Sequence, residues 1–221
     1  MSVTSAGDDA NDDAKNDAEI SAENALILDA DGWCRGAVCQ PSPNFDLRPQ
    51  DAIISLLVIH NISLPSGKYG STYISDLFCN RLDYNADPSF SELRDLRVSA
   101  HFLIRRDGEL LQFVATDARA WHAGVSSFDG RQRCNDFSIG VELEGCDGEA
   151  FTDAQYQTLV RLTVALQQRH PLTDVAGHQH IAPGRKTDPG PCFDWQHYHT
   201  LFRLGQPQVL TTGSLRFTAL R

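Results

Sequence analysis

The stretch Ser55-Leu56-Leu57-Val58-Ile59-His60-Asn61 is a short apolar run that lies between polar residues and ends in a histidine. An apolar run of this length, without polar alternation, predicts a strand that is buried on both faces. The prediction places His60 at the strand end, where a sheet opens toward a cleft. A single histidine in that position is more often structural than a ligand, so this stretch indicates the fold before it indicates any chemistry.

Two further segments have strand patterns. Residues 101–105 and 110–114 flank Asp107-Gly108, a dipeptide that tolerates the positive φ angles of a tight hairpin turn. Residues 137–144 alternate between apolar side chains and polar or small ones, which predicts a strand with two different faces. The residues expected to face the core are Phe137, Ile139, Val141 and Leu143, and those expected on the opposite face are Ser138, Gly140, Glu142 and Glu144.

The pattern becomes helical from Thr152 onward. Thr152 and Gln155 resemble a capping box, and apolar residues follow at helical spacing until the helix should end before Pro171. Further helices are expected over residues 193–204 and 71–80. Together these segments predict a mixed α/β fold, in which α-helices flank a central mixed β-sheet.

Length and charge predict one main domain with an extension at each end. The chain has 221 residues, a length that suits one compact domain with a sizeable core, and a small two-domain layout is the alternative. Its net charge is −10. Residues 1–24 carry seven acidic residues and one lysine, a contribution of 1 − 7 = −6, and leave −4 for the remainder. We expect 1–24 to be an acidic disordered tail, 25–204 the folded domain and 205–221 a C-terminal extension of unknown role. The alternative for the tail is an acidic interaction arm.

Composition also bears on compartment and partners. The N-terminus has no basic region followed by an apolar one, which argues against a secretory signal, and the longest apolar stretch, residues 53–59, is too short to span a bilayer. The six cysteines form no CxxC pair, so we expect reduced thiols in a cytoplasmic protein. The alternative is a bridge between Cys34 and Cys39 in an oxidising setting. An acidic chain without basic stripes predicts binding to neither nucleic acid nor membrane.

A second stretch, from Gly177 to Pro191 (GHQHIAPGRKTDPGP), gathers two imidazoles, an ammonium and a carboxylate. Its prolines remove backbone donors and fix φ, so the segment is expected to be a loop and not a regular helix. Histidine and aspartate together suit a divalent zinc ion, and loops on a rigid scaffold are common places for chemistry. The alternative is a solvated surface loop without a function.

Seven segments, in this order, are similar to one enzyme family: HNISLP at 60–65, LRVSAH at 96–101, LIRRDG at 103–108, AWHAGVS at 120–126, RCNDFSIG at 133–140, ELEG at 142–145 and the segment 177–195. The family is that of the cytoplasmic 1,6-anhydro-N-acetylmuramyl-L-alanine amidases of peptidoglycan recycling (the AmpD type). It belongs to the zinc amidases that include phage T7 lysozyme and the peptidoglycan recognition proteins. The resemblance runs from about Trp33 to about Leu204 and implies the fold of these amidases.

The resemblance implies a role for five residues. His60, His178 and Asp188 match the ligands of one catalytic zinc ion, whose fourth position is left for water. Glu142 matches the general base, although Glu144 shares its strand face and could exchange roles with it. Lys186 matches the cation that stabilises the oxyanion, with the neighbouring Arg185 as the competing choice.

The remaining candidates concern the substrate and the other histidines. His122 belongs to a segment that resembles the cleft loop of the family and not its metal ligands. His180 is expected near the metal without binding it, or exposed, and His101 is expected to orient a neighbour by hydrogen bonding. No catalytic role is expected for His170, His197 and His199. The residues that could contact the substrate are Asn61, Arg97, Trp121 and Arg133.

The resemblance implies a zinc-dependent N-acetylmuramoyl-L-alanine amidase. Its expected substrate is an anhydro-muropeptide, cut between the lactyl group and L-alanine, and it is expected to act as a monomer in the bacterial cytoplasm. Clearing such muropeptides is implied to affect inducible β-lactamase expression. One alternative is an amidase of the same fold that acts on intact peptidoglycan, and another is a muropeptide-binding module without catalysis.

Overall fold

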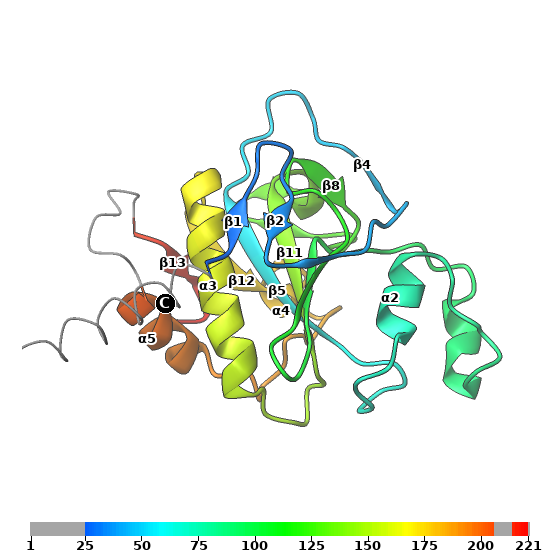
Figure 1. Ribbon diagram of the computed structural model, residues 1–221. Coiled ribbons are helices and arrows are strands. Elements are labelled where there is room, and N and C mark those ends of the chain that lie inside the picture. The colour runs from blue at the N-terminus through cyan, green and yellow to red at the C-terminus, as the bar shows by residue number, and fades with distance from the viewer. Residues whose placement is uncertain (1–24, 206–213, 221) are drawn as a thin grey trace, which may run out of the picture.

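A seven-stranded mixed sheet forms the centre of the computed structural model, which describes residues 25–205 and 214–220 (Figure 1). Neighbouring strands run parallel except at one antiparallel hairpin, formed by β6 and β7. Across the sheet the order is β13 (Arg216–Phe217), β12 (Asp174–Gly177), β5 (Leu56–Ile62), β11 (Ser138–Glu144), β6 (Phe102–Ile104), β7 (Leu110–Gln112) and β3 (Val38–Cys39).

The apolar run at 55–61 forms β5, as predicted, between β12 and β11. Residues 56–59 are at most 1% exposed, because both faces of this strand are covered. The parallel register pairs His60 with Glu142 of β11, and paired residues on adjacent parallel strands project to the same face. The hairpin turn is confirmed too: Gly108 has a φ of 88°, and its amide donates to the carbonyl of Arg105 at 2.9 Å.

Helices α3 (Asp153–Arg169) and α5 (Trp195–Gly205) pack together against one face of the sheet (Figure 1). The capping box of α3 is confirmed, since the Thr152 hydroxyl accepts from the Gln155 amide while the Gln155 side chain accepts from the Thr152 amide. Helix α5 begins two residues later than predicted because the Asp194 carboxylate accepts from the His197 amide and caps it.

Both faces of β11 are buried. The alternation at 137–144 therefore does not distinguish a core face from a solvent-exposed face. Ile139, Val141 and Leu143 belong to the hydrophobic core cluster under α3, as expected. Phe137 is buried in a hydrophobic core, as expected, but not on the same face as these three residues, because it precedes the strand and packs in the cluster on the other side, with Leu56.

The predicted loop 177–191 begins with one helical turn, α4 (His178–Ile181), directly after β12. The expectation of a loop without helix is therefore wrong for these four residues. All three prolines of the segment lie beyond Ile181, so none of them removes a donor from this turn. The turn presents His178 as its first residue, at the end of β12 beside β5.

The described part of the predicted C-terminal extension packs against the sheet. Strand β13 pairs in parallel with β12, and Leu215 and Phe217 are buried in the core cluster with Tyr198 and Phe202. The predicted acidic tail, residues 1–24, lies outside the described residues. The division into a domain and two extensions therefore stays a prediction.

Smaller elements complete the described chain. Helix α2 (Tyr73–Phe78) is shorter than the predicted 71–80 and packs in a core cluster with Phe113. The other elements are three two-stranded sheets and three 3₁₀ turns: β1 (Ile27–Leu28) with β2 (Cys34–Arg35), β4 (Phe45–Leu47) with β8 (Ala118–Ala120), β9 (Ser127–Phe128) with β10 (Arg131–Gln132), η1 (Pro88–Leu93), η2 (Cys134–Asp136) and η3 (Thr218–Leu220).

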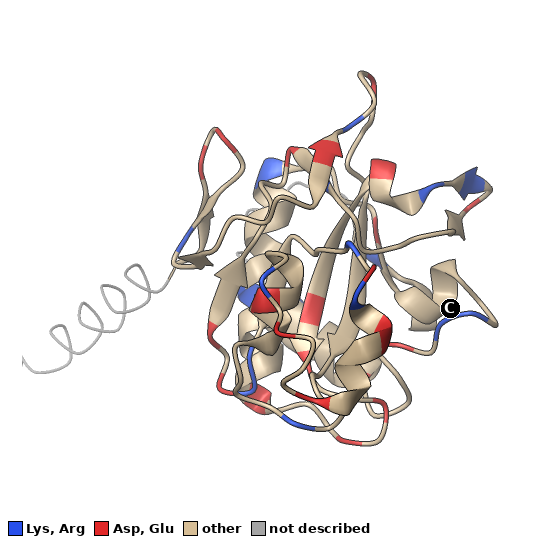
Figure 2. Ribbon diagram, turned by 90° about the vertical axis from the view of Figure 1, so that its right-hand side faces the viewer, with Lys and Arg blue, Asp and Glu red and all other residues tan. Residues whose placement is uncertain are grey.

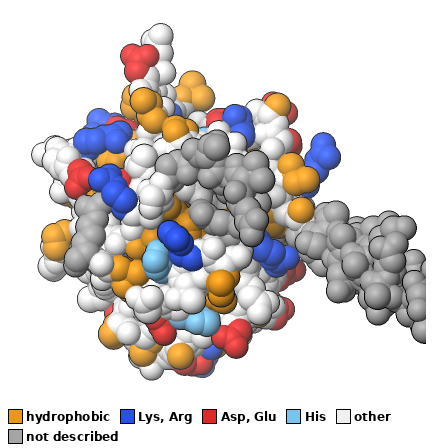
Figure 3. Space-filling view, turned by 90° about the vertical axis from the view of Figure 1, so that its left-hand side faces the viewer, with side chains coloured by type: hydrophobic (Ala, Val, Ile, Leu, Met, Phe, Trp, Pro, Cys, Tyr) orange, Lys and Arg blue, Asp and Glu red, His pale blue; other side chains and the backbone are white. Residues whose placement is uncertain are grey.

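The surface is mixed in character. Basic and acidic residues are interspersed over the described chain (Figure 2), and hydrophobic side chains near α5 alternate with charged and polar ones (Figure 3). All six cysteines are unpaired, so the Cys34–Cys39 bridge is not formed. Among the described helices, none has the length and apolar character needed to cross a membrane.

Buried histidines make the fold sensitive to acid. His170, at the end of α3, forms a hydrogen bond with the Thr116 hydroxyl at 2.9 Å. Burial lowers the pKa of His170 to about 4. The charge of Asp117 acts to raise this pKa, and the charges of Arg169 and Arg48 act to lower it. A histidine with a lower pKa in the folded chain contributes stability above its unfolded pKa of about 6.5, and this is lost as the pH falls toward 4. We expect the unfolding free energy to decrease over this window.

The variant His170→Gln tests this expectation. The slope of unfolding free energy against pH between 6.5 and 4 should decrease by up to about 1.4 kcal/mol per pH unit, because one proton uptake on unfolding is removed. Chemical denaturation at a series of pH values measures the slope. Equal slopes for the variant and the wild type would contradict it.

Candidate metal centre and active-site cleft

Three side chains from separate parts of the fold converge at the carboxyl end of the central strands. The Nδ1 atoms of His60 and His178 are 3.0 Å apart, and each lies 3.0 Å from Oδ2 of Asp188. His60 comes from β5, His178 from the first position of α4, and Asp188 from the loop that follows. The structure thus brings together the three predicted ligands.

This donor set fits a zinc ion. Zinc–nitrogen and zinc–oxygen bonds are about 2.0–2.2 Å long, so tetrahedral ligand atoms are separated by about 3.3 Å, close to the observed triangle. The Nε2 atom of His178 lies 3.0 Å from the carbonyl oxygen of Ala123, to which it donates. Its proton is therefore on Nε2, and Nδ1 has a free lone pair toward the triangle. Three acceptor atoms at this separation favour a cation between them.

Electrostatics favours a neutral imidazole at His60 and an ionised carboxylate at Asp188. Burial lowers the pKa of His60 to about 4, although its contact with Asp188 acts in the opposite direction, so the imidazole is neutral near pH 7. Burial acts to raise the pKa of Asp188, but the contacts with His178 and His60 outweigh it and the pKa lies below its usual range. Neutral imidazoles and an ionised carboxylate are the forms that bind zinc.

Glu142 points into the same cleft beside the triangle. It is 9% exposed, and its Oε2 atom is buried without a hydrogen-bond partner. Burial raises its pKa well above the ordinary value, the charge of Asp188 adds to this, and Lys186 opposes it. Burying a carboxylate without a hydrogen-bond partner lowers the stability of the fold. A group that is kept in spite of this cost, with a shifted pKa and in a cleft, is a candidate for proton transfer.

Glu144, the other acid on this strand face, is engaged elsewhere. Its Oε1 atom accepts from the Gly70 amide at 2.7 Å and from Arg105 at 3.1 Å, and its Oε2 atom accepts from the Arg106 amide at 3.2 Å. These contacts hold Glu144 in a buried ion pair. The geometry therefore favours Glu142 for the predicted general base.

The cleft is a cavity of about 300 Å³ that contains most of the predicted site. Lys186 lines it and is exposed, whereas Arg185 donates to the carbonyl groups of Ala123 and Val125. Besides the three ligands, Glu142 and Lys186, the polar lining consists of Asn61, Ser99, Trp121 and His122, and the apolar wall consists of Ile62, Leu64, Leu77, Phe78, Leu93, Leu96 and Val98.

The four predicted substrate residues divide into two pairs. Asn61 and Trp121 line the cleft, but the Asn61 amide donates to Asp147 at 2.7 Å and to the Pro189 carbonyl at 3.0 Å. Arg97 and Arg133 are exposed and do not line this cavity. The Arg97 guanidinium donates to the backbone carbonyls of Arg94 and Leu96. Arg133 forms an ion pair with Asp136 at 3.2 Å and lines a different cavity. Their roles stay predictions.

The histidines outside the triangle have distinct positions. His122 was assigned to the cleft loop, and the structure places its Nδ1 atom 2.9 Å from Nε2 of His60, a contact that sequence reasoning missed. His180 contributes no atom to the triangle and accepts from the Gly177 amide at 2.8 Å. His101 accepts from the Gly140 amide at 3.0 Å, consistent with the expected orienting contact. His197 and His199 belong to α5.

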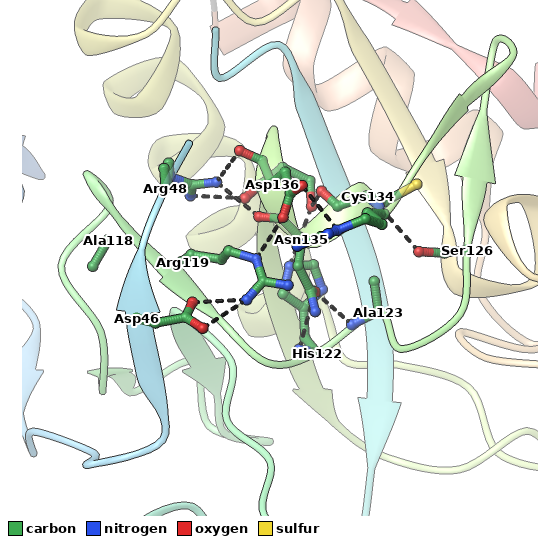
Figure 4. A network of polar contacts seen from close by, with 12 residues as sticks. Asp46, Arg48, Ala118, Arg119, His122, Ala123, Ser126, Cys134, Asn135 and Asp136 are labelled. Atoms are coloured by element: carbon green, nitrogen blue, oxygen red, sulfur yellow. Dashed lines mark hydrogen bonds and ion pairs between the residues drawn. The ribbon is translucent and has the colours of Figure 1, made fainter. Parts of the chain in front are cut away.

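A polar network supports the loop behind the triangle (Figure 4). The Arg48 guanidinium donates to the carbonyl oxygens of Asn135 at 2.9 Å and Ser138 at 2.8 Å. Arg119 bridges Asp46 at 2.7 Å and Asp136 at 2.6 Å. These contacts fix the segment that leads into β11. The sequence analysis did not single out Arg48 or Arg119, and their isolated positions in the chain give no signal of the network.

The fold and the converging donor atoms define a buried site that could hold a metal ion, and comparison with known proteins identifies the family. Residues 50–191 match the family described as N-acetylmuramoyl-L-alanine amidase. The chain belongs to the N-acetylmuramoyl-L-alanine amidase family.

Within this family the chain is most usefully compared with the AmpD enzymes. It is 57% identical over 178 residues to the 1,6-anhydro-N-acetylmuramyl-L-alanine amidase AmpD of Citrobacter freundii. The aligned region covers 80% of this chain and 95% of that protein. The crystal structure of a selenomethionine derivative of AmpD is 56% identical, with a TM-score of 0.76 over 79% of this chain and 98% of the other. A Drosophila peptidoglycan recognition protein, PGRP-LB, is 15% identical and shares the fold, with a TM-score of 0.50 over 69% and 83% of the two chains. The predicted fold class is confirmed.

Proposed function

We propose that this protein hydrolyses the amide bond between the lactyl group of 1,6-anhydro-N-acetylmuramic acid and L-alanine in muropeptides, with one zinc ion. It does so as a monomer in the bacterial cytoplasm, where it recycles peptidoglycan fragments. The observation that carries the proposal is the triangle of His60, His178 and Asp188, with Glu142 in the same cleft. The AmpD relatives carry this activity in their names, which supports the choice of substrate.

The residues of the cleft divide the chemistry among them. His60, His178 and Asp188 would hold the zinc ion, which supplies a Lewis acid that polarises the amide carbonyl and makes water nucleophilic at neutral pH. Glu142 takes a proton from the attacking water and later delivers it to the departing amine of L-alanine. Lys186 stabilises the negative charge that develops on the carbonyl oxygen. The apolar residues that line the cleft reduce the access of water to the reacting groups.

Product identification on two substrates tests the proposal. The purified protein, with its zinc content measured by elemental analysis, is incubated with a soluble anhydro-muropeptide and with purified sacculi, and the products are identified by mass spectrometry. We expect stoichiometric zinc and release of a peptide that begins with L-alanine from the soluble substrate. Preferential release from sacculi would support an amidase of intact cell wall instead. Binding of the muropeptide without cleavage would support a non-catalytic module.

A further inference from the structure

The segment His122-Ala123 contacts both metal-binding histidines on the side away from the triangle. Nδ1 of His122 lies 2.9 Å from Nε2 of His60, and the carbonyl oxygen of Ala123 lies 3.0 Å from Nε2 of His178. A metal-binding imidazole is oriented by the hydrogen bond that its other nitrogen makes. Two adjacent residues therefore occupy the orienting positions for both ligands.

The position of each proton follows from a chain of contacts that begins at Ser138. The Ser138 hydroxyl lies 2.6 Å from the Cys134 carbonyl oxygen and 3.2 Å from Nε2 of His122. A carbonyl can only accept, so the single hydroxyl hydrogen goes to Cys134. The Ser138 oxygen is then left to accept, and Nε2 of His122 must donate to it.

The remaining protons are then determined. His122 is 9% exposed, and its ring nitrogens contact the Ser138 hydroxyl and the His60 ring, neither of which is an acid. A buried imidazole without an acidic partner is in its neutral form, which carries one proton. With that proton on Nε2, Nδ1 of His122 accepts, and Nε2 of His60 donates to it. This leaves the lone pair of His60 on Nδ1, directed at His178 and Asp188.

Close contacts surround the ring and the backbone of His122. A Cβ atom on Gly140 would overlap the His122 ring, so only glycine leaves room for it at this point of β11. The Asn135 side-chain oxygen accepts from the amides of both His122 and Ala123, at 3.2 and 2.8 Å, and so fixes the backbone of the segment (Figure 4). The rings of His60 and His122 meet edge to face, with centroids 5.0 Å apart.

We propose that His122 and Ser138 are positioning residues that set the tautomer of His60, so that its Nδ1 lone pair faces the metal position before any metal binds. The relay runs from the Cys134 carbonyl through Ser138 and His122 to His60. Asn135 holds the same segment so that the Ala123 carbonyl does this for His178. The proposal rests on the proposed zinc site, and it assigns no role in bond breaking to these residues.

Two measurements test the relay without using activity. Long-range ¹H–¹⁵N correlation spectra of the zinc-free protein report which ring nitrogen of His60 carries the proton, and we expect Nε2 in the wild type. Competition with a chromophoric chelator measures zinc affinity, which should fall about 10- to 100-fold in His122→Leu, as it does when a metal ligand loses its outer hydrogen-bond partner. In Ser138→Ala the zinc affinity should decrease by less than in His122→Leu. The spectrum of this variant should show a mixture of both His60 tautomers, because His122 can then adopt either tautomer.

Conservative and matched variants separate positioning from folding. His122→Gln should recover most of the lost affinity, since its amide oxygen can accept from His60 while its NH₂ group donates to Ser138. His170→Leu is the matched control, because it also removes a buried histidine that is hydrogen-bonded to a hydroxyl, that of Thr116, but lies outside the cleft. The zinc affinity of this variant should equal that of the wild type. Should His122→Leu not fold, Ser138→Ala and the wild-type spectrum still decide the question.

Three outcomes would overturn the relay: a proton on Nδ1 of His60 in the zinc-free wild type, wild-type zinc affinity in both His122→Leu and Ser138→Ala, or an equal loss of affinity in His170→Leu. Failure of the proposed function is distinguishable from these results. A wild-type protein that binds no zinc would remove the metal site, while the spectrum of His60 would still report whether Ser138 and His122 set its tautomer.

Discussion

Replacing Asp188 with alanine should abolish zinc binding and turnover together. Asp188 supplies the only negative charge of the triangle, and its Oδ2 atom is 3.0 Å from both imidazoles. Two imidazole nitrogens would remain, one ligand fewer than catalytic zinc sites keep. Elemental analysis after dialysis and the rate of peptide release measure the two losses, and we expect less than about one-hundredth of wild-type turnover without metal assistance.

Two further variants make this prediction specific. Asp188→Cys supplies a thiolate, which zinc also binds, and should retain metal. Asp174 is a buried carboxylate on β12, the strand that leads to His178, and it accepts a hydrogen bond from Arg216 at 2.6 Å. Replacing it in Asp174→Asn should leave the zinc content unchanged. Full zinc occupancy in a folded Asp188→Ala variant would remove Asp188 from the ligand set.

Replacing Glu142 with glutamine leaves zinc bound and lowers kcat by about two to four orders of magnitude, the usual contribution of general acid–base catalysis. Glutamine keeps the shape of the side chain but cannot take a proton from water. Because Oε2 of Glu142 is buried without a partner, the substitution should not lower the unfolding free energy. Steady-state kinetics, zinc analysis and thermal unfolding measure the three quantities.

The matched control is Glu144→Gln, on the same face of the same strand. It weakens the ion pair with Arg105 and should therefore lower stability, while kcat stays close to that of the wild type. Glu142→Gln is thus expected to lower kcat without lowering stability, and Glu144→Gln to lower stability without lowering kcat. A large loss of kcat in Glu144→Gln, with near-normal kcat in Glu142→Gln, would assign the base to Glu144 instead.

Local patterns in the chain predicted most of the scaffold. The apolar run at 55–61, the Asp107-Gly108 turn and the capping box of Thr152 and Gln155 each depend on contacts between near neighbours, and each is confirmed. The errors came from segments whose conformation depends on distant residues. Phe137 packs on the unexpected side because the strand begins only after it, and His178 begins a helical turn because the prolines lie further along.

The candidate site was predicted in part. The resemblance of the chain to zinc amidases indicated His60, His178 and Asp188, and the structure adds that their donor atoms lie 3.0 Å apart. Alternation placed Glu142 on one strand face without showing that this face is enclosed, since a period of two is the same for a buried face and an exposed one. The structure distinguishes the two cases, because the His122 ring packs against Gly140 and Ser138 on this face of β11.

The sequence by itself determined β5, β11, the hairpin of β6 and β7, helix α3, the family and the identity of the chemical groups, because these depend on side-chain type and on spacing along the chain. Tertiary structure alone decided which of two glutamates faces the cleft unpaired, and that His122 lies against His60. Ser138 and His122 are 16 residues apart, and His122 and His60 are 62 apart. Hydrogen bonds act over about 3 Å, so a proton relay between such residues exists only where the fold brings them into contact.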